Sequence, residues 1–485
     1  MTMRVVNTLA RKLSRQIWPN ADAEILIKAI LLDERTATAC WQDWRSRRDL
    51  DHVGWHEHKL LARLAARLTR LAPDCSYRPR VEGLAKAHWT HSQVMLRSSA
   101  QAIDLLLDRE IPVMLLKGGA LQAAALAGQG PRIASDLDIM VRRSDFARAV
   151  TCLYQAGWTS KDSVEFARVR WRFDSGTNLR LPPHGDIDVH HQPLHGARVS
   201  EAVLGGLWSR SEQKNLHGRT VWVPPIADLL VFASAHAVHS QASSEPSATW
   251  IFDIEALVAQ RSLTADQVVA SALAFQAVPA TLAVLYYLDQ LRPEPVIAEL
   301  IAALEATGQG VGAWMAFSLA AMKRPHGKLL RSLVRRVRKP AGIEFEQDVV
   351  PRIHPRLSRQ PTARGASGEN PTAQFARRHD IDLPQPLGAH SRVVVEFDFE
   401  PVVSRRYQFD VSGDGVPLAR LTCRAKSVPP GEVCHVTATI PTVGIAPRRV
   451  AIESLARASL IVNPTPDERA AAKPAPFLVR RVAWD

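Results

Sequence analysis

Apolar residues recur along this chain with two different periods, and the change of period separates helical from strand-forming parts. In the N-terminal part the period is that of an amphipathic helix, with leucines three or four residues apart at Leu61, Leu64, Leu68 and Leu71. Segments 226–239 and 250–257 carry similar apolar stripes. The pattern predicts helices on both sides of a central region that spans residues 111–215.

Beyond residue 390 the period becomes two, as in strands with one buried face. Val395, Phe397 and Phe399 alternate with Glu396 and Asp398. Further strands are predicted at 407–411, 419–426, 434–440, 450–454 and 477–484. About six short strands of this kind are typical of a small antiparallel sandwich or barrel.

The central region opens with a strand, a glycine turn and a helix. The apolar run 111–116 is rich in strand formers and stops at Lys117, Gly118 and Gly119. Alanines and leucines from 120 to 126 then favour a helix. Glycine lets the backbone approach an anion closely, and unpaired N–H groups at a helix N-terminus attract phosphate. We therefore expect a phosphate-binding turn at 117–119, with Lys117 adding positive charge.

Two later strands carry carboxylates at alternate positions. Asp136 and Asp138 would project from one face of a strand, about 7 Å apart. In segment 185–190 the same alternation places Asp188 and His190 on one face. Like charges this close repel unless a cation lies between them, and magnesium prefers a few carboxylates together with phosphate oxygens. A neighbouring strand would bring Asp188 against the first pair.

Taken together, these residues resemble the nucleotidyltransferase superfamily, which has the polymerase-β-like fold. In that superfamily a Gly-Gly or Gly-Ser turn precedes an Asp-hydrophobic-Asp strand, and a later Asp is flanked by apolar residues. The chain looks most like the bacterial branch known as uncharacterised nucleotidyltransferases. The matches are Leu116-Lys117-Gly118, Arg132, Asp136 with Asp138, and Asp188-Val189-His190. Two features depart from the pattern: Gly119 stands where serine is often found, and sixteen residues separate Gly119 from Asp136.

The resemblance implies an α+β fold, with a nucleotidyltransferase-type mixed sheet between helical flanks. It also implies transfer of a nucleoside monophosphate from a nucleoside triphosphate, such as ATP, to an acceptor hydroxyl or phosphate, with release of pyrophosphate. Asp136 and Asp138 would bind two magnesium or manganese ions, and Asp188 would ligate the second ion and accept the proton of the attacking hydroxyl. The turn formed by Lys117, Gly118 and Gly119 would hold the pyrophosphate. Arg132 would either neutralise phosphate oxygens or form an ordinary loop ion pair.

The patterns predict five consecutive parts. They are an N-terminal helical region at 1–110, a nucleotidyltransferase core at 111–215, a helical subdomain that closes the cleft at 216–322, a basic helix with a Pro-rich linker at 323–390, and a β-rich accessory domain at 391–485.

The segment 323–339 is strongly basic. It contains eight Lys or Arg residues and no acidic residue, with apolar residues at helical spacing. A basic amphipathic helix can touch anionic lipid, RNA or DNA phosphate, or an acidic partner. The alternative, which we favour, is a solvated helix whose apolar stripe packs on the preceding domain.

Composition adds limits on the class of protein. The chain has 485 residues, a formal net charge of +13 and five cysteines. The cysteines are scattered, odd in number and without Cys-x-x-Cys spacing, so neither a disulfide framework nor a zinc site is expected. Basic residues interrupt the N-terminus, and no run approaches the roughly twenty apolar residues of a membrane span. These features favour a cytoplasmic enzyme.

Other interpretations of the same residues remain. Asp136 and Asp138 could hold the metal of a glycosyltransferase that uses a nucleotide sugar, which would require a parallel α/β region before them. A non-catalytic nucleotide-binding scaffold is the second alternative. His236 and His239 are three residues apart and could bind metal, although ordinary helix histidines are commoner. The identity of the acceptor and the oligomeric state are not legible in the sequence.

Overall fold

The computed structural model describes most of the chain and divides into two compact units. The described residues are 3–126, 133–172, 174–195, 199–241, 247–322, 352–361, 376–384, 392–401, 405–429, 432–442, 446–455 and 475–485. The first unit comprises Met1–Asp145 and Asp174–Glu344, and the second comprises Phe146–Phe173 and Phe345–Asp485. Residues 146–173, which separate the aspartate strands in sequence, therefore belong with the C-terminal part of the chain.

Helices fill the described N-terminal residues of the first unit. They are α1 (Met3–Ser14), η1 (Arg15–Ile17), α2 (Ala21–Leu31), α3 (Glu34–Arg47), η2 (Leu50–His52), α4 (Trp55–Leu71) and α5 (Arg78–Leu107). Asn20 begins α2 because its side chain accepts a hydrogen bond from the Ala23 N–H at 2.8 Å. In α4, the stripe of Leu61, Leu64 and Leu68 is fully buried, as the spacing predicts.

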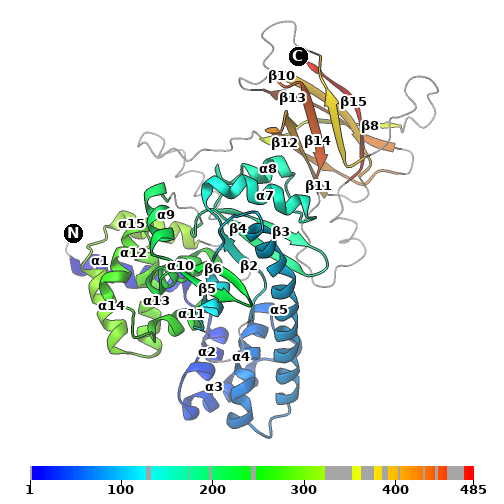
Figure 1. Cartoon of the computed structure of the whole chain (residues 1–485). Coiled ribbons are helices and arrows are strands. Elements are labelled where there is room, and N and C mark those ends of the chain that lie inside the picture. Colours follow the sequence, from blue (N-terminus) through cyan, green and yellow to red (C-terminus); the bar gives the residue numbers. More distant parts are fainter. Residues whose placement is uncertain are drawn as a thin grey trace. The chain divides into compact units, whose positions relative to one another are not determined.

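A six-stranded mixed sheet lies at the centre of the first unit. Its strand order is β3-β4-β2-β1-β6-β5. The strands are β1 (Met114–Leu115), β2 (Leu137–Met140), β3 (Gly176–Leu181), β4 (Gly185–His190), β5 (Glu212–Leu216) and β6 (Arg219–Val223). β2 pairs with β4 in parallel, whereas β1 runs antiparallel to β2. In Figure 1, α5 runs alongside the β3–β4 end of the sheet, and the later helices of the unit gather at the other end.

These later helices follow the sheet. They are α9 (Glu201–Arg210), α10 (Ile226–Gln241), α11 (Trp250–Val258), α12 (Ala265–Ala274), α13 (Val278–Leu291), α14 (Pro295–Glu305) and α15 (Val311–Ala321). Two short elements, the helix α6 (Lys117–Ala123) and η3 (Arg143–Asp145), lie between strands. α13 is buried almost all round and forms the centre of this group. No helix in the described part of the chain combines the length and apolar character that crossing a membrane requires.

The second unit contains a β sandwich. One sheet has the order β15-β10-β13-β8 and the other β7-β12-β11-β14-β9. The strands are β7 (Arg352–Ile353), β8 (Arg356–Pro361), β9 (Arg378–Asp382), β10 (Arg392–Phe399), β11 (Arg405–Gly413), β12 (Val416–Ala425), β13 (Glu432–Pro441), β14 (Arg449–Ser454) and β15 (Phe477–Trp484). Phe397 of one sheet packs on Phe409 of the other, with ring centroids 4.6 Å apart. The mixed sheet and this sandwich confirm the predicted α+β class.

Part of the predicted linker is folded. β7, β8 and β9 all lie within residues 340–390, and each is an edge strand of its sheet. Edge strands carry polar residues and proline because one side faces solvent, so their sequence lacks the alternation of a central strand. The basic segment 323–339 lies outside the described residues.

Residues 146–173 form α7 (Phe146–Gln155), α8 (Val164–Arg168) and η4 (Arg170–Arg172). They are tied to the sandwich by buried charges. Arg420 of β12 donates hydrogen bonds of 2.8 Å to both Asp162 and Asp410, and Asp410 accepts another from the Ser163 N–H. Both aspartate side chains are about 1% exposed, so their charges depend on Arg420 and on Arg170, which also binds Asp162.

Candidate active site

The predicted phosphate turn lies directly after β1. Lys117 has a φ of 44°, in the left-handed region, and α6 begins at this residue. The Leu116 N–H donates to the Asp138 carbonyl at 3.0 Å, which fixes the turn beside β2. A Cβ at Gly119 would lie 3.0 Å from Leu137 Cδ1 and 3.6 Å from Leu115 Cδ2. The turn therefore packs closely against side chains of both strands at position 119.

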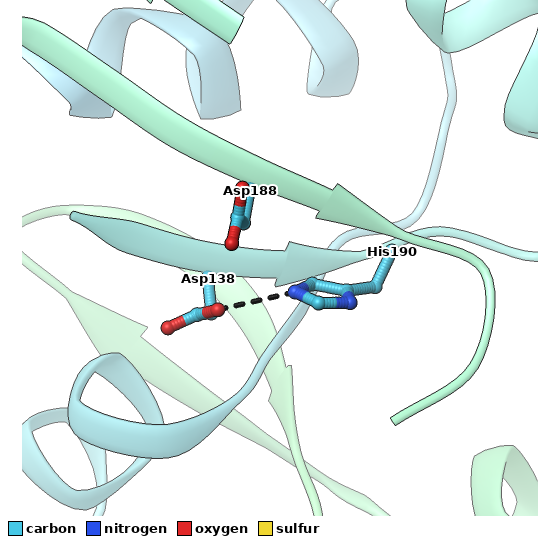
Figure 2. A group of neighbouring side chains, drawn as sticks. All are labelled: Asp138, Asp188 and His190. Atoms are coloured by element: carbon cyan, nitrogen blue, oxygen red, sulfur yellow. Dashed lines mark hydrogen bonds and ion pairs between the residues drawn. The ribbon is translucent and has the colours of Figure 1, made fainter. Parts of the chain in front are cut away.

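Asp138 and Asp188 lie side by side on neighbouring strands. The parallel register of β2 and β4 pairs Asp138 with Asp188, and Met140 with His190. Register partners on neighbouring strands point to the same face of a sheet, and neighbouring strands are roughly 4.8 Å apart. The two carboxylates therefore lie close together on one face. Figure 2 shows Asp188 beside Asp138, with the His190 ring facing the Asp138 carboxylate. The expectation that a neighbouring strand brings Asp188 against the first aspartates holds for Asp138.

Two cationic or polar groups contact the Asp138 carboxylate. Lys117 Nζ lies 2.6 Å from Asp138 Oδ1, and His190 Nε2 lies 3.1 Å from the same oxygen. Asp138 and His190 are almost fully buried. Burial by itself would raise the pKa of Asp138, but Lys117 and His190 outweigh it and hold that pKa well below its usual value. In the same way, the carboxylates outweigh the effect of burial on Lys117 and raise its pKa.

Asp136 is in a different electrostatic situation. It precedes β2 by one residue, and its carboxylate accepts a long hydrogen bond of 3.4 Å from Ser135 Oγ. Burial and the neighbouring charge of Asp138 raise the pKa of Asp136 to about 7, in spite of Lys117. Because the two carboxyls interact, the pair takes up its first proton at Asp136, whose pKa is raised, while the pKa of Asp138 is lowered.

Asp138, Asp188 and His190 form a group that fits a divalent cation. Each offers one ligand atom, and these atoms all lie within 4.8 Å of one another. Carboxylate oxygens suit magnesium and manganese, whereas imidazole is a ligand more typical of transition metals. Asp136 is not part of this group, and neither are His236 and His239. Among the described residues, the structure thus brings together two of the three predicted carboxylates and adds His190.

Helix α5 supports both aspartate strands from behind. Ser99 exchanges hydrogen bonds of 3.0 Å with the backbone N–H and carbonyl of Asp186. Ser92 accepts a bond of 2.9 Å from the Ala134 N–H, just before Asp136. The Asp186 carboxylate itself is occupied by Asn178, at 2.7 Å. It therefore points to β3 and is separate from the group around Asp138.

A chain of contacting histidine rings begins at His190. The sequence pattern did not predict these contacts. His195 meets His190 edge-on, with centroids 5.6 Å apart, and stacks on His239 at 4.3 Å. His236 lies one helical turn from His239 on α10, and burial lowers its pKa to about 3. The rings come from different elements, so only the spacing of the α10 pair was visible in sequence. Arg132 lies outside the described residues.

A comparison with known protein families also points to a nucleotidyltransferase. Residues 55–293 match the profile of a family described as uncharacterised nucleotidyltransferase. No curated protein matches the sequence. One similar solved structure is the lincomycin-bound lincosamide antibiotic adenylyltransferase LnuA, with 19% identity, 34% of this chain and 96% of that chain covered, and a TM-score of 0.24. Another is the antibiotic-resistance factor ANT(2'')-Ia, with 11% identity, coverages of 50% and 99%, and a TM-score of 0.22.

TM-scores this low do not establish a common fold, so the family match carries the assignment. The matched region contains the glycine turn, both aspartate strands and α10. Residues 55–293, just under half of the chain, match the family of uncharacterised nucleotidyltransferases, and this match identifies the region as a nucleotidyltransferase domain.

Proposed function

We propose that this protein transfers a nucleoside monophosphate from a nucleoside triphosphate to an acceptor hydroxyl or phosphate and that the reaction depends on a divalent cation. The observation that supports it best is the pairing of Asp138 with Asp188 on parallel strands, next to the Lys117 turn. Two carboxylates on one face, with an ammonium group on their rim, form a site for a metal-bound triphosphate.

The proposed roles of the residues follow from their positions. Asp136, Asp138 and Asp188 hold the divalent cations, magnesium or manganese. When bound, such cations stabilise charge on the triphosphate and lower the pKa of the attacking group. Lys117, Gly118 and Gly119 bind the outgoing pyrophosphate, and Arg132 binds phosphate oxygens. Lys117 Nζ lies 2.6 Å from Asp138, so its ammonium group balances the carboxylate charge before substrate arrives.

The proposed chemical step is an in-line displacement at the α-phosphorus. A bond forms between the acceptor oxygen and the α-phosphorus as the bond to the pyrophosphate oxygen breaks. When the acceptor is a hydroxyl, Asp188 accepts its proton. Asp188 suits this role because Asp138 binds Lys117 and His190, whereas Asp188 has no ion-pair partner of this kind in the described residues.

The glycosyltransferase alternative required a parallel α/β region before Asp136. The described residues 3–107 contain helices and no strand, and β1 is the only strand before β2 in the described part of the chain. This arrangement lends that alternative no support.

The test uses the purified chain, magnesium or manganese, and each of the four nucleoside triphosphates labelled at the α-phosphate, with cell extract as the source of acceptors. We expect pyrophosphate release and transfer of the label to an acceptor with at least one triphosphate. Asp138→Asn and Asp188→Asn should abolish transfer, because each removes a carboxylate that holds the divalent cation. Asp186→Asn is the matched control, since its carboxylate faces Asn178 instead.

Other results would contradict the proposal. Metal-dependent binding of triphosphate without turnover for any acceptor fraction would indicate the non-catalytic scaffold. Transfer of sugar from a nucleotide sugar would indicate the glycosyltransferase.

A further inference from the structure

The candidate cation site offers a nitrogen atom beside its carboxylate oxygens. His190 Nε2 lies with one oxygen of Asp138 and one of Asp188 in a group whose ligand atoms are all within 4.8 Å of one another. Magnesium takes oxygen ligands, whereas imidazole is a ligand of transition metals. His190 is therefore the residue of this group that distinguishes between the two classes of cation.

The spacing of His190 from Asp138 is that of two ligands of one ion. Nε2 lies 3.1 Å from Asp138 Oδ1. Adjacent ligands of an octahedral ion, each about 2.2 Å from the metal, are also about 3.1 Å apart. A cation would thus replace the hydrogen bond between the two side chains without a movement of their strands.

The group is open to a cation on one side. Asp138 and His190 are almost fully buried, but Asp188, the register partner of Asp138, is partly exposed. Lys117 contacts the same Asp138 oxygen at 2.6 Å, and its flexible side chain withdraws when a cation takes that place. Access for the ion therefore requires a lysine rotamer change and no opening of the sheet.

Contacts around His190 hold its ring in the ligand position. His195 meets the ring edge-on, with centroids 5.6 Å apart, and His195 is itself fixed by Ser175, whose Oγ lies 2.6 Å from His195 Nδ1. The Nδ1 atom of His190 is buried and has no hydrogen-bond partner among the described residues. Nε2 is therefore the nitrogen that the ring presents to the carboxylates.

We infer that His190 Nε2 is a direct ligand of the cation and that the site therefore selects a first-row transition metal over magnesium. This inference rests on the proposed function and deepens it, because it names the class of the metal. Affinity for nitrogen and oxygen ligands rises from manganese towards copper, so manganese shows the smallest preference and is the most demanding probe.

The experiment measures metal binding to the full-length protein in the absence of nucleotide, by calorimetry with manganese and with magnesium in separate titrations. Wild type should bind manganese at least about tenfold more tightly than magnesium. His190→Gln keeps a side chain that donates to Asp138 but removes the imidazole. Manganese affinity should therefore fall by about 10–100-fold, and magnesium affinity by much less. His184→Gln removes an exposed histidine and should leave both affinities unchanged.

A spectroscopic signature separates direct ligation from a structural role of His190. Pulsed electron paramagnetic resonance of bound manganese should show the coupling of a directly bound nitrogen in wild type and in His184→Gln, and none in His190→Gln. Isotopic labelling of the histidine nitrogens in wild type should change this coupling, which identifies the ligand without any substitution.

Four results would overturn the inference: no saturable manganese binding, equal affinity for the two ions, an unchanged affinity ratio in His190→Gln, or bound manganese without nitrogen coupling. None of them excludes nucleotidyl transfer with magnesium, which the assay with labelled triphosphates decides. Failure of the metal preference is therefore distinguishable from failure of the proposed function.

Discussion

At the scale of single residues, the contrast between Asp136 and Asp138 governs the chemistry of the site. Asp138 has two partners, Lys117 and His190, and its pKa is lowered. For Asp136, burial and the repulsion of the Asp138 carboxylate raise the pKa to about 7. The same residue type, two positions apart, therefore has pKa shifts of opposite direction, and the difference arises because Lys117 and His190 contact Asp138.

The raised pKa of Asp136 predicts proton release when a metal binds. Below pH 7 Asp136 is mainly protonated, and a cation at the site would displace that proton. Magnesium affinity should therefore fall by about tenfold per pH unit below 7 and be flat above it. Calorimetry at pH 6 in two buffers of different ionisation enthalpy measures the released proton. Asp136→Asn should release none, and equal apparent enthalpies for wild type in both buffers would contradict the prediction.

His190 should matter for metal affinity. It lies 3.1 Å from Asp138 Oδ1 and within the group that fits a cation. Loss of a ligand or of the group that orients one typically lowers metal affinity by about 10–100-fold, so His190→Gln should do the same for manganese. His184→Gln, an exposed histidine in the β3–β4 turn, is the control. Unchanged manganese affinity in His190→Gln would exclude His190 from the metal site.

At the scale of elements, the parallel pairing of β2 with β4 creates the site, and β3 keeps β4 in place. The turn at 182–184 returns the chain antiparallel from β3 to β4, and Gly176 at the start of β3 pairs with His190. A Cβ at Gly176 would overlap the Val189 carbonyl oxygen and lie 3.0 Å from His190 Cα. Backbone at this distance cannot move aside as a side chain can.

Gly176→Ala should therefore separate β3 from β4. We expect a loss of about 1–3 kcal/mol of unfolding free energy. Metal binding should also weaken, because β4 carries Asp188 and His190. Gly205→Ala in α9 meets nothing within 4 Å and should stabilise the protein by about 0.5–1 kcal/mol. Chemical denaturation of both variants measures the difference. Similar stability for the two alanine variants would show that β3 moves without cost.

Element prediction from sequence succeeded where one face of an element is buried. The six strands with alternating apolar residues, such as β10 with Val393, Val395 and Phe397, form where the pattern predicts them. β8 (Arg356–Pro361) was assigned to a linker because its residues are polar and it ends in proline. Its strand conformation comes from pairing with β13 across the sheet edge, which the local sequence does not encode.

At the scale of the whole molecule, each of the two units is built from two separate stretches of the chain. Residues 146–173 leave the first unit after η3 and return at Asp174, so the aspartate strands β2 and β4 are connected through a segment that belongs with the sandwich. The predicted division into five consecutive parts has no such crossing. The sandwich therefore cannot be regarded as a simple C-terminal extension.

Arg420 should be essential for the stability of the second unit. Its replacement by methionine leaves Asp410 buried without its arginine partner and leaves Asp162 with Arg170 alone, which costs about 3–5 kcal/mol. The matched control is Arg424→Met on the same strand, whose side chain is exposed. Thermal unfolding should show a lower transition for Arg420→Met and no shift for Arg424→Met. An unshifted transition for Arg420→Met would mean that the aspartates are solvated.

Truncation tests the discontinuity directly. A chain that ends at residue 344 keeps every candidate catalytic residue but loses the partners of segment 146–173. We expect protease cleavage within 146–173 in the truncated protein and protection of the same segment in the full chain. Equal protection in both proteins would show that this segment folds without the sandwich.

The sequence by itself determined the type of the elements that carry the site, the alternating strands of the sandwich, and the residues with the chemistry of a nucleotidyltransferase, but it did not predict β5 and β6, which lie at 212–223 beside and within the predicted helical subdomain. Those properties are local, because burial imposes a period on a single segment. Only the tertiary structure decided that Asp138 lies beside Asp188, that His190 joins them, that the pKa of Asp136 is raised, and that segment 146–173 packs with the sandwich. Each of these depends on strand register or on charges brought together from distant parts of the chain, and neither quantity is contained in the local pattern.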